Sequence, residues 1–253
     1  MPDRPSCLVT KLGHYISISE KDKERLVVIE KSERSYGAGA EIHSSGETSS
    51  ELFVVKRGWL ISSNVLPNGK RQIVKVHLPG DIIGFPDISQ RYATSTTSAV
   101  EDVEVCPFPK SALDMILRES PRLSALMLTI ALRDQVVFAD LLRALGSMAA
   151  RARLCYMLLD LAARLKVTNP NMEDSFRLPL SQSQIGDYLG LTNVYVSKSL
   201  MRMENDGMIA RDGKTVRLLR PEEMSEACDF HNRYHEMDTS WFPGSHEQLH
   251  KMP

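Results

Sequence analysis

The chain has 253 residues, 42% of them hydrophobic and 25% charged, and its formal net charge is -1. This length allows two modest domains, and this composition is that of a packed globular protein, which excludes a disordered or fibrous chain. No apolar run approaches the roughly 18 residues that span a bilayer, and the first residues lack the hydrophobic segment of a signal peptide. We therefore expect a cytoplasmic protein with no membrane partner.

The charge is distributed unevenly along the chain, although its sum is close to zero. Residues 147–220 carry 11 Lys and Arg against 7 Asp and Glu, a local charge of +4, so the remainder carries -5. Four cysteines lie far apart with no Cys-x-x-Cys pair, which argues against a disulfide framework and a zinc knuckle. Cys106 and Cys155 lie in apolar patterns, so we expect them to be packed small side chains.

Residues 1–118 are predicted to form a small antiparallel β-barrel or roll. Ser19 has the position of an N-cap at the start of a short helix. Across residues 32–108, short β-rich runs are separated by glycine turn signals. Asn68 and Gly69 give the best hairpin prediction, because both residues tolerate the positive φ of a type I′ turn.

Residues 119–146 are predicted to be one long helix, since the run after Pro121 has no internal proline and consists of good helix formers. Its apolar residues recur by four and three, a period of 3.5 that suits a partner helix. Asp134 interrupts this row. The predicted dimer seam consists of the apolar members Leu123, Met127, Ile130, Val137 and Leu141. The alternative is that the row packs on the chain's own domain.

Residues 147–220 are predicted to form a winged helix-turn-helix that binds double-stranded DNA. Ser181-Gln-Ser-Gln184 is a capping-box arrangement, which predicts a short helix that begins there. Gly190 ends that helix in a tight turn, and the next helix runs from 192 to 205. Two alternating runs around Asp212-Gly213 then predict a hairpin of the wing type.

The outer face of the helix 192–205 is expected to enter the major groove, because Val196 and Leu200 bury the opposite face. The residues predicted to lie nearest the bases are Asn193, Val194, Ser197 and Lys198. The residues predicted to contact phosphates are Ser181, Gln182, Thr192, Arg202 and Lys214.

Residues 221–253 are predicted to be a C-terminal extension. Cys228, His231 and His235 have the spacing of metal ligands on a helix, and so do His246 and His250. Pro243-Gly244 interrupts this segment, and Trp241 and Phe242 indicate docking. We expect an appendage that is packed on the body, without a metal ion.

Two stretches resemble the bacterial Crp/Fnr superfamily, which includes the cyclic-AMP receptor protein and the fumarate-nitrate regulator. One runs from Leu66-Pro-Asn-Gly through Leu78-Pro-Gly-Asp-Ile-Ile-Gly84 and the other from Leu180 through Gly213, within a resemblance over roughly residues 10 to 220. The resemblance implies an α+β fold: an N-terminal antiparallel β-roll of the cyclic-nucleotide-binding type, a long dimerisation helix and a C-terminal winged helix-turn-helix. It also implies a homodimeric transcription regulator that acts on a palindromic promoter site, with RNA polymerase as a further partner.

The residues that hold a cyclic nucleotide in this superfamily differ here. Phe85 follows Gly84 where relatives have the glutamate that holds the ribose, and Ala93 and Thr94 stand where an Arg-Ser pair holds the phosphate. Without that arginine, a buried cyclic phosphate would lack its charge partner. We therefore expect no cyclic AMP, while these four residues stay the candidate pocket for a small effector of another kind.

Other cofactors of the superfamily also lack their signatures. Iron-sulfur sensors use a cluster of N-terminal cysteines, whereas only Cys7 lies near this N-terminus. Haem-binding relatives use a histidine or cysteine near the roll, where His43 and His77 are candidates, but Phe85-Pro-Asp-Ile fills the stretch in which the carbon-monoxide sensor has its ligand. We expect no cofactor, with haem kept as an alternative.

The reading helix departs from the superfamily as well. Val194 stands where relatives often place a glutamate that accepts from cytosine, and Lys198 replaces the usual arginine and its bidentate geometry toward guanine. The operator should therefore differ from the best-known half-sites. A metal-dependent oxygenase on a β-barrel is the enzymatic alternative, but it would need clustered ligands that His43 and His77 do not supply. The main hypothesis is a DNA-binding regulator and not an enzyme.

Overall fold

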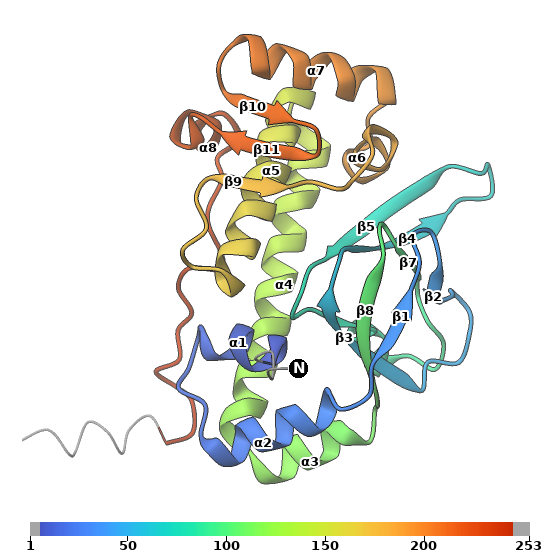
Figure 1. The fold of residues 1–253 in the computed structure, drawn as a ribbon, viewed down its shortest axis with the longest axis vertical. Coiled ribbons are helices and arrows are strands. Elements are labelled where there is room, and N and C mark those ends of the chain that lie inside the picture. The colour runs from blue at the N-terminus through green and yellow to red at the C-terminus, as the bar shows by residue number, and fades with distance from the viewer. Residues whose placement is uncertain (1–5, 245–253) are drawn as a thin grey trace, which may run out of the picture.

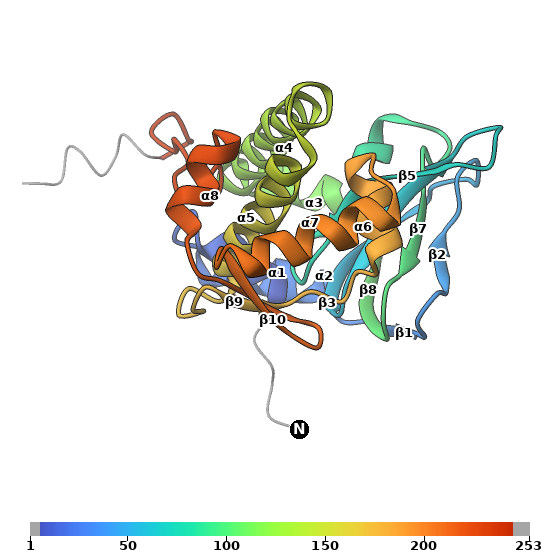
Figure 2. The same cartoon turned by 90° about the horizontal axis from the view of Figure 1, so that it is seen from above.

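In the computed structural model, which describes residues 6–244, two long helices connect a β-roll with a winged domain (Figure 1). Helix α4 (Pro121–Ser147) runs along most of the molecule, and α5 (Ala150–Thr168) lies beside it. From above, the roll lies on one side of these helices and α8 on the other (Figure 2). The expected α+β architecture and the single long helix are confirmed.

The roll consists of two four-stranded antiparallel sheets. The first has the order β1-β8-β3-β6, with the bounds Arg34–Tyr36, Val103–Pro109, Glu51–Arg57 and Ile82–Ile83. The second has the order β2-β7-β4-β5, with the bounds Glu41–His43, Thr96–Ala99, Leu60–Val65 and Arg71–His77. Between the sheets lies a buried apolar core that includes Phe53, Val55 and Leu60.

The β4–β5 hairpin forms where it was predicted, but its turn is of another kind. The Gly69 amide donates to the Leu66 carbonyl at 2.8 Å, and the Leu66 amide donates to Lys70 at 2.8 Å. Gly69 has φ 78°, whereas Asn68 has no positive φ. The type I′ prediction is therefore wrong. Three residues, and not two, separate Leu66 from its hydrogen-bonded partner Lys70, so only the last of the three, Gly69, needs the left-handed conformation.

Three short helices close the lower end of the molecule in Figure 1, namely α1 (Cys7–Gly13), α2 (Glu20–Ile29) and α3 (Ala112–Glu119). The Ser19 hydroxyl caps α2 as predicted and accepts the amide of the third helical residue at 3.2 Å. Helix α1 was not predicted. The three helices share one buried apolar cluster with the first turns of α4, and this cluster anchors α4 to the roll.

Helix α4 has two apolar rows, and the predicted dimer row is the inner one. Leu123 is 1% exposed and Leu141 6%, so both pack within the chain, and Met127, Ile130 and Val137 are half-buried beside them. Within one chain these five residues are thus buried or half-buried, which favours the alternative that the row packs on the chain's own domain. The outer row carries Leu128, Leu132, Gln135, Ala139 and Leu142.

Asp134 interrupts the inner row because it meets the roll. Its carboxylate accepts from Lys75 of β5 and from Arg133, each at 2.9 Å. Burial acts to raise the pKa of Asp134, but these two cations outweigh burial and lower the pKa to about 2. The residue that weakened the predicted seam is thus a partner of the roll.

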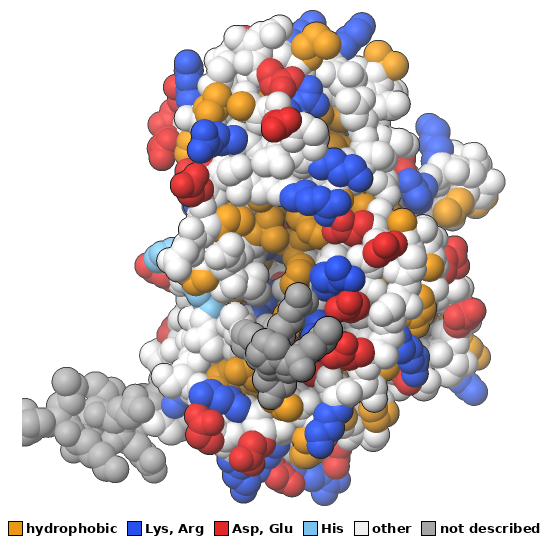
Figure 3. Space-filling view, in the orientation of Figure 1, with side chains coloured by type: hydrophobic (Ala, Val, Ile, Leu, Met, Phe, Trp, Pro, Cys, Tyr) orange, Lys and Arg blue, Asp and Glu red, His pale blue; other side chains and the backbone are white. Residues whose placement is uncertain are grey.

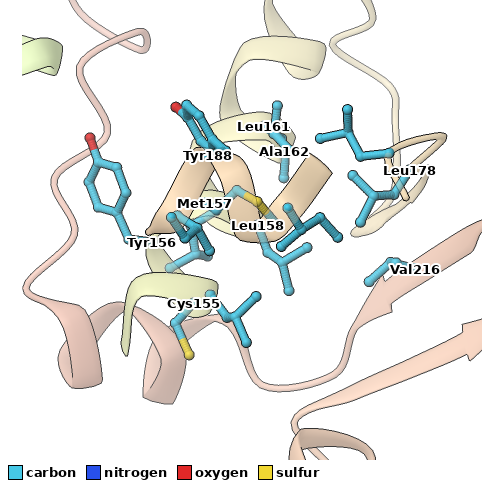
Figure 4. Close-up of a cluster of buried hydrophobic side chains, with 14 of the residues drawn as sticks. Cys155, Tyr156, Met157, Leu158, Leu161, Ala162, Leu178, Tyr188 and Val216 are labelled. Carbon is cyan, nitrogen blue, oxygen red and sulfur yellow. The ribbon is translucent and has the colours of Figure 1, made fainter. Parts of the chain in front are cut away.

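The winged domain is built on α5. Its elements are β9 (Ser175–Arg177), α6 (Gln182–Leu189), α7 (Asn193–Asn205), β10 (Ile209–Asp212) and β11 (Thr215–Leu218). Figure 4 shows side chains of α5, among them Met157 and Leu161, in one cluster with Leu178 and Val216. Cys155 is packed there as expected, and burial raises the pKa of its thiol to about 11.

After α8 (Pro221–Cys228), the extension runs along the outside of α4 and α5. The Tyr234 hydroxyl donates to the Asp160 carboxylate at 2.7 Å, and Arg233 donates to Asp140 at 2.9 Å. Phe242 is fully buried in the cluster formed by α1–α4, whereas Trp241 is half exposed. The extension therefore packs on the body as expected and ties the winged domain to the N-terminal helices.

The three metal-ligand candidates of the extension do not converge. The Cys228 thiol is buried at the end of α8 and donates to a carbonyl of its own helix at 3.1 Å. His231 and His235 lie beyond the helix with exposed rings, so the helical spacing that suggested a site is lost. In the described part of the chain, no group of three His, Cys, Asp or Glu side chains could hold a metal ion. His246 and His250 lie outside the described residues.

No helix within residues 6–244 is both long and apolar enough to cross a membrane.

Candidate DNA-binding interface

The first helix of the predicted motif begins with the expected capping box. The Gln184 amide donates to the Ser181 hydroxyl at 3.1 Å, and the Ser181 amide donates to the Gln184 side chain at 2.8 Å. The first amides of a helix have no carbonyl partner within the helix, and here side chains satisfy two of them. The sequence alone fixes where α6 starts.

Two glycines set the angle between α6 and α7. Gly190 ends α6 in the left-handed conformation with φ 65°, which favours a residue without a Cβ. At Gly186, a Cβ would lie 2.5 Å from the backbone oxygen of Leu191, so any side chain would push the turn away. The close approach of the turn to α6 therefore requires glycine at this position.

Helix α7 begins at the predicted cap and exposes the predicted face. The Thr192 hydroxyl accepts the Tyr195 amide at 3.3 Å. Val196, Leu200 and Met203 are buried on the inner face. Seen from above, α7 lies uncovered across the end of the molecule (Figure 2).

The wing follows α7 as predicted. Strands β10 and β11 pair antiparallel with Asp212 opposite Thr215, and β9 adds a third strand beside β11. The two-residue turn between them consists of Gly213, with φ 57°, and Lys214. The exposed Lys214 therefore lies at the tip of the wing.

All nine predicted DNA-contacting residues lie in the region from the start of α6 to the wing tip. Seven of them are exposed, and Gln182 and Ser197 are half-buried. The exposed aromatic side chain of Tyr195 was missed, although its place between two predicted contact residues could have indicated it.

Three cations on this surface are available to an anionic partner. Within residues 6–244, the side chains of Lys198, Arg202 and Lys214 have neither a hydrogen bond nor an ion pair. By contrast, Arg211 is paired with Glu204 and is already neutralised. Figure 3 shows basic and hydrophobic side chains along the upper edge of the molecule, which α7 forms. Unpaired cations on an uncovered helix fit the phosphates that flank a DNA groove.

Polar side chains of the roll contact α5 and the winged domain. Arg71 of β5 forms an ion pair with Asp187 of α6 at 2.7 Å, and the Gln72 side chain donates to the Tyr188 carbonyl at 3.2 Å. Deeper in the molecule, Arg164 of α5 reaches Asp81 of the roll at 2.7 Å. These contacts join the roll to α5 and α6 and so link the roll physically to the winged domain.

The residues predicted to form an effector pocket do not share one cavity. Asp87, in the short turn Pro86–Ser89, occupies the region with its own carboxylate, which accepts the Thr94 amide at 3.0 Å and the Thr94 hydroxyl at 2.7 Å. His43 lies 3.1 Å from the other carboxylate oxygen. The Thr94 donors and the His43 ring thus have a buried side-chain partner in Asp87.

The remaining candidates of that pocket are placed differently from one another. Gly84 is buried against Leu52, and Ala93 forms backbone hydrogen bonds with the loop at Gly46. Only Phe85 faces open space, a cavity of about 640 Å³ between α4, the N-terminal helices and the roll. Phe85 lines this cavity, whereas Thr94 lies in the bend before β7 and is bonded to Asp87, so the predicted four-residue pocket does not form.

Neither candidate haem ligand reaches this cavity. His43 faces Asp87, and the His77 ring accepts or donates a hydrogen bond with the Ser62 hydroxyl at 2.7 Å. Burial lowers the pKa of His77 to about 3, so the ring is neutral. Among the described residues, no histidine or cysteine lines the cavity, which does not fit an axially ligated haem.

Two known family models match the chain, one at the roll and one at the winged domain. Residues 33–120 match the model of the cyclic nucleotide-binding domain, and residues 152–227 match that of the Crp-like helix-turn-helix domain. The first match covers the roll, and the second covers α5 and the winged domain.

Similar proteins extend the match over most of the chain. The transcriptional activator protein FnrA of Stutzerimonas stutzeri is 30% identical over 213 residues, which are 84% of this chain and 87% of that protein. The fumarate and nitrate reduction regulatory protein of Escherichia coli K12 is 26% identical over 220 residues, covering 87% and 88%. The structure of FixK2 from Bradyrhizobium japonicum has a TM-score of 0.70 and 26% identity, covering 78% of this chain and 96% of that one. These relatives are regulators of transcription rather than enzymes, and the chain belongs to the Crp/Fnr family of transcription regulators.

Proposed function

We propose that the chain acts in the cytoplasm as a homodimer that reads a palindromic promoter site with α7. The observation that carries this proposal is the uncovered outer face of α7 beside three unpaired cations. In this arrangement Asn193, Val194, Ser197 and Lys198 contact bases. The residues that contact phosphates are Ser181, Gln182, Thr192, Arg202 and Lys214.

Selection from random DNA by the purified full-length protein tests this proposal. We expect the recovered fragments to share one inverted repeat, with half-sites about one helical turn apart, because a two-fold dimer places two copies of α7 in successive major grooves. Affinity should fall steeply with salt, since phosphate contacts release counterions. Recovery of fragments with no common sequence would contradict the proposal.

The outer row of α4 supports a second copy of the chain as the dimer partner. Leu128 is 53% exposed and Leu142 71% exposed, and with Leu132, Gln135 and Ala139 they recur by four and three. That spacing forms the seam of a two-stranded coiled coil. We therefore shift the proposed seam from the inner row to this outer row.

Substitution of Leu132 by Asp separates the two rows experimentally. The buried charge should dissociate a dimer whose seam is the outer row, and sedimentation equilibrium would measure the loss. The matched control is Leu117→Asp, which changes an exposed leucine of α3 outside the row. A variant that stays as dimeric as the control would contradict the outer seam.

A small apolar effector is the second candidate function, and the cavity beside Phe85 favours it. Its wall is largely aliphatic and also includes five charged side chains, those of Lys11, Lys75, Asp81, Arg133 and Asp134. Ligand pockets typically have this volume and this combination of apolar walls with a few polar groups. An effector held there would contact α4 directly and could bias the position of the winged domain.

Thermal-shift screening of amphipathic small molecules tests the effector. A ligand that binds only the folded state raises the melting temperature by mass action. Ala131→Phe, which fills the cavity, should abolish the shift, whereas Ala38→Phe in an exposed loop should retain it. A ligand whose shift is the same in both variants binds elsewhere and would contradict this site.

As a regulator bound at a promoter, the dimer would act through RNA polymerase. The name of the FnrA relative as an activator supports carrying this partner over to the chain.

A further inference from the structure

Val194 points directly away from the core of the winged domain. Each residue of an α-helix turns about 100° from the one before it. Val196 and Leu200 mark the buried side of α7, so Val194 and Lys198 lie on the opposite side, one turn apart. These two side chains form the outermost row at the N-terminal end of α7.

This outermost position is apolar, which is unusual for a surface that meets DNA. Val194 is 63% exposed and Tyr195 is 53% exposed, so the chain itself does not bury either side chain. Val194 has no polar atom beyond the backbone, so its side chain can form no hydrogen bond with a base. Its only favourable contact in a groove is with another apolar group, which it would remove from water.

The major groove of B-DNA offers one such group, the C5-methyl of thymine. We propose that Val194 is a specificity-determining residue that contacts a thymine methyl group in each half-site of the operator. The proposal rests on the proposed function, because it requires α7 to lie in the major groove. Lys198, one turn further along the same row, then reaches the neighbouring base or its phosphate.

Tyr195 has a different part in this geometry. It lies about 100° around α7 from Val194, so the two side chains cannot meet the same base edge. Tyr195 therefore faces the wall of the groove, where its hydroxyl can donate to a phosphate oxygen. Tyr195→Phe should weaken binding to all sequences alike, whereas a change at Val194 should alter the preference between sequences.

Removal of single methyl groups from the DNA tests the proposal. The operator selected by the full-length protein is synthesised with each thymine replaced in turn by deoxyuridine, and the dissociation constant is measured at one fixed salt concentration. Loss of one buried methyl group should weaken binding about fourfold, and loss of the symmetric pair about fifteenfold. We expect this effect at one thymine position per half-site.

Variants of the protein assign the effect to a residue. In Val194→Ala, the difference between thymine and deoxyuridine at that position should fall below about twofold. Met201→Ala is the matched control, because Met201 is an exposed apolar residue about 10 Å further along α7, and it should retain the full difference. Val194→Glu should replace the preference for thymine by one for cytosine, whose amino group a carboxylate accepts from.

The outcomes distinguish this inference from the proposed function. If the protein selects no common DNA sequence, the proposed function fails. If it selects an operator but no deoxyuridine substitution weakens binding, or if Val194→Ala keeps the full difference, the function stands and the thymine contact is wrong. A loss of the difference in Met201→Ala alone would place the contact at the other end of α7.

Discussion

The winged domain and the β-roll treat their polar groups in opposite ways. Around α7, Lys198, Arg202 and Lys214 are exposed and unpaired among the described residues. In the roll, Asp87 satisfies the donors of Thr94, and Ser62 bonds with both His77 and Thr97. The chain thus leaves cations unpaired around α7 and pairs polar side chains with one another in the roll.

This difference distinguishes the two halves of the regulator. Family membership follows from both halves, but the surface of α7 leaves its cations open, whereas Ser62, Thr97 and Asp87 of the roll have partners within the roll. Among the described residues, Ser49 Oγ and His77 Nδ1 are buried atoms of the roll without such a partner. Because the Thr94 donors already have the Asp87 carboxylate as a partner, they need no ligand to be satisfied. Four changes would break or sharpen this contrast.

Asp87→Ala should have the largest effect, because it removes the hydrogen-bond acceptor at the centre of the polar cluster in the roll. The Thr94 amide and hydroxyl and the His43 ring would each lose a buried partner, so the free energy of unfolding should fall by about 3 kcal/mol. Urea unfolding of the full-length protein measures this. Asp114→Ala, which removes an exposed carboxylate paired with Arg118, should cost under about 0.5 kcal/mol. Equal costs would mean that Asp87 does not hold the region closed.

Lys198→Ala removes a cation from the open side. One contact in each half-site is lost, so affinity for the operator should fall on the order of 100-fold while the dimer stays intact. Lys21→Ala, a change at an exposed lysine of α2, should leave affinity unchanged. Fluorescence anisotropy with operator and random duplexes measures both, and an unchanged preference would remove Lys198 from the base contacts.

Mild acid should weaken the roll through His77. Burial lowers the pKa of His77 to about 3. The unfolded chain therefore binds a proton below pH 6.5 that the folded chain does not, and stability falls as the pH falls. Between pH 6.5 and 5.0 the loss from this group is about 1.5 kcal/mol. Urea unfolding should show this loss reduced in His77→Gln and retained in His14→Gln, which changes an exposed ring. Equal losses in both variants would mean that water reaches His77.

Cyclic AMP should have the smallest effect. The Asp87 carboxylate already occupies the Thr94 donors, so millimolar cyclic AMP should change neither the melting temperature nor the operator affinity. The measurement is repeated with Asp87→Ala, which frees the Thr94 amide and hydroxyl. A rise in melting temperature of the unaltered protein would overturn the view that the region is closed.

Much of the DNA-binding surface could be predicted from the sequence because its signals are local. The Ser181–Gln184 capping box, the Thr192 cap and Gly190 act within a few residues of themselves, so they specify where α6 and α7 begin and end. The order of the wing after α7 is local for the same reason. Burial on one face of α7 then leaves Val194 and Lys198 on the other.

Only the tertiary structure decided which apolar row of α4 is covered and what fills the roll. Both rows satisfy the same spacing, and the inner one is chosen by Asp134 and Lys75, which are 59 residues apart. Asp87 meets His43 across 44 residues. Likewise, the ligand spacing of Cys228 and His231 lost its meaning when α8 ended between them. Contacts between distant segments depend on the tertiary packing of the whole chain, which the periodicity of one segment does not predict.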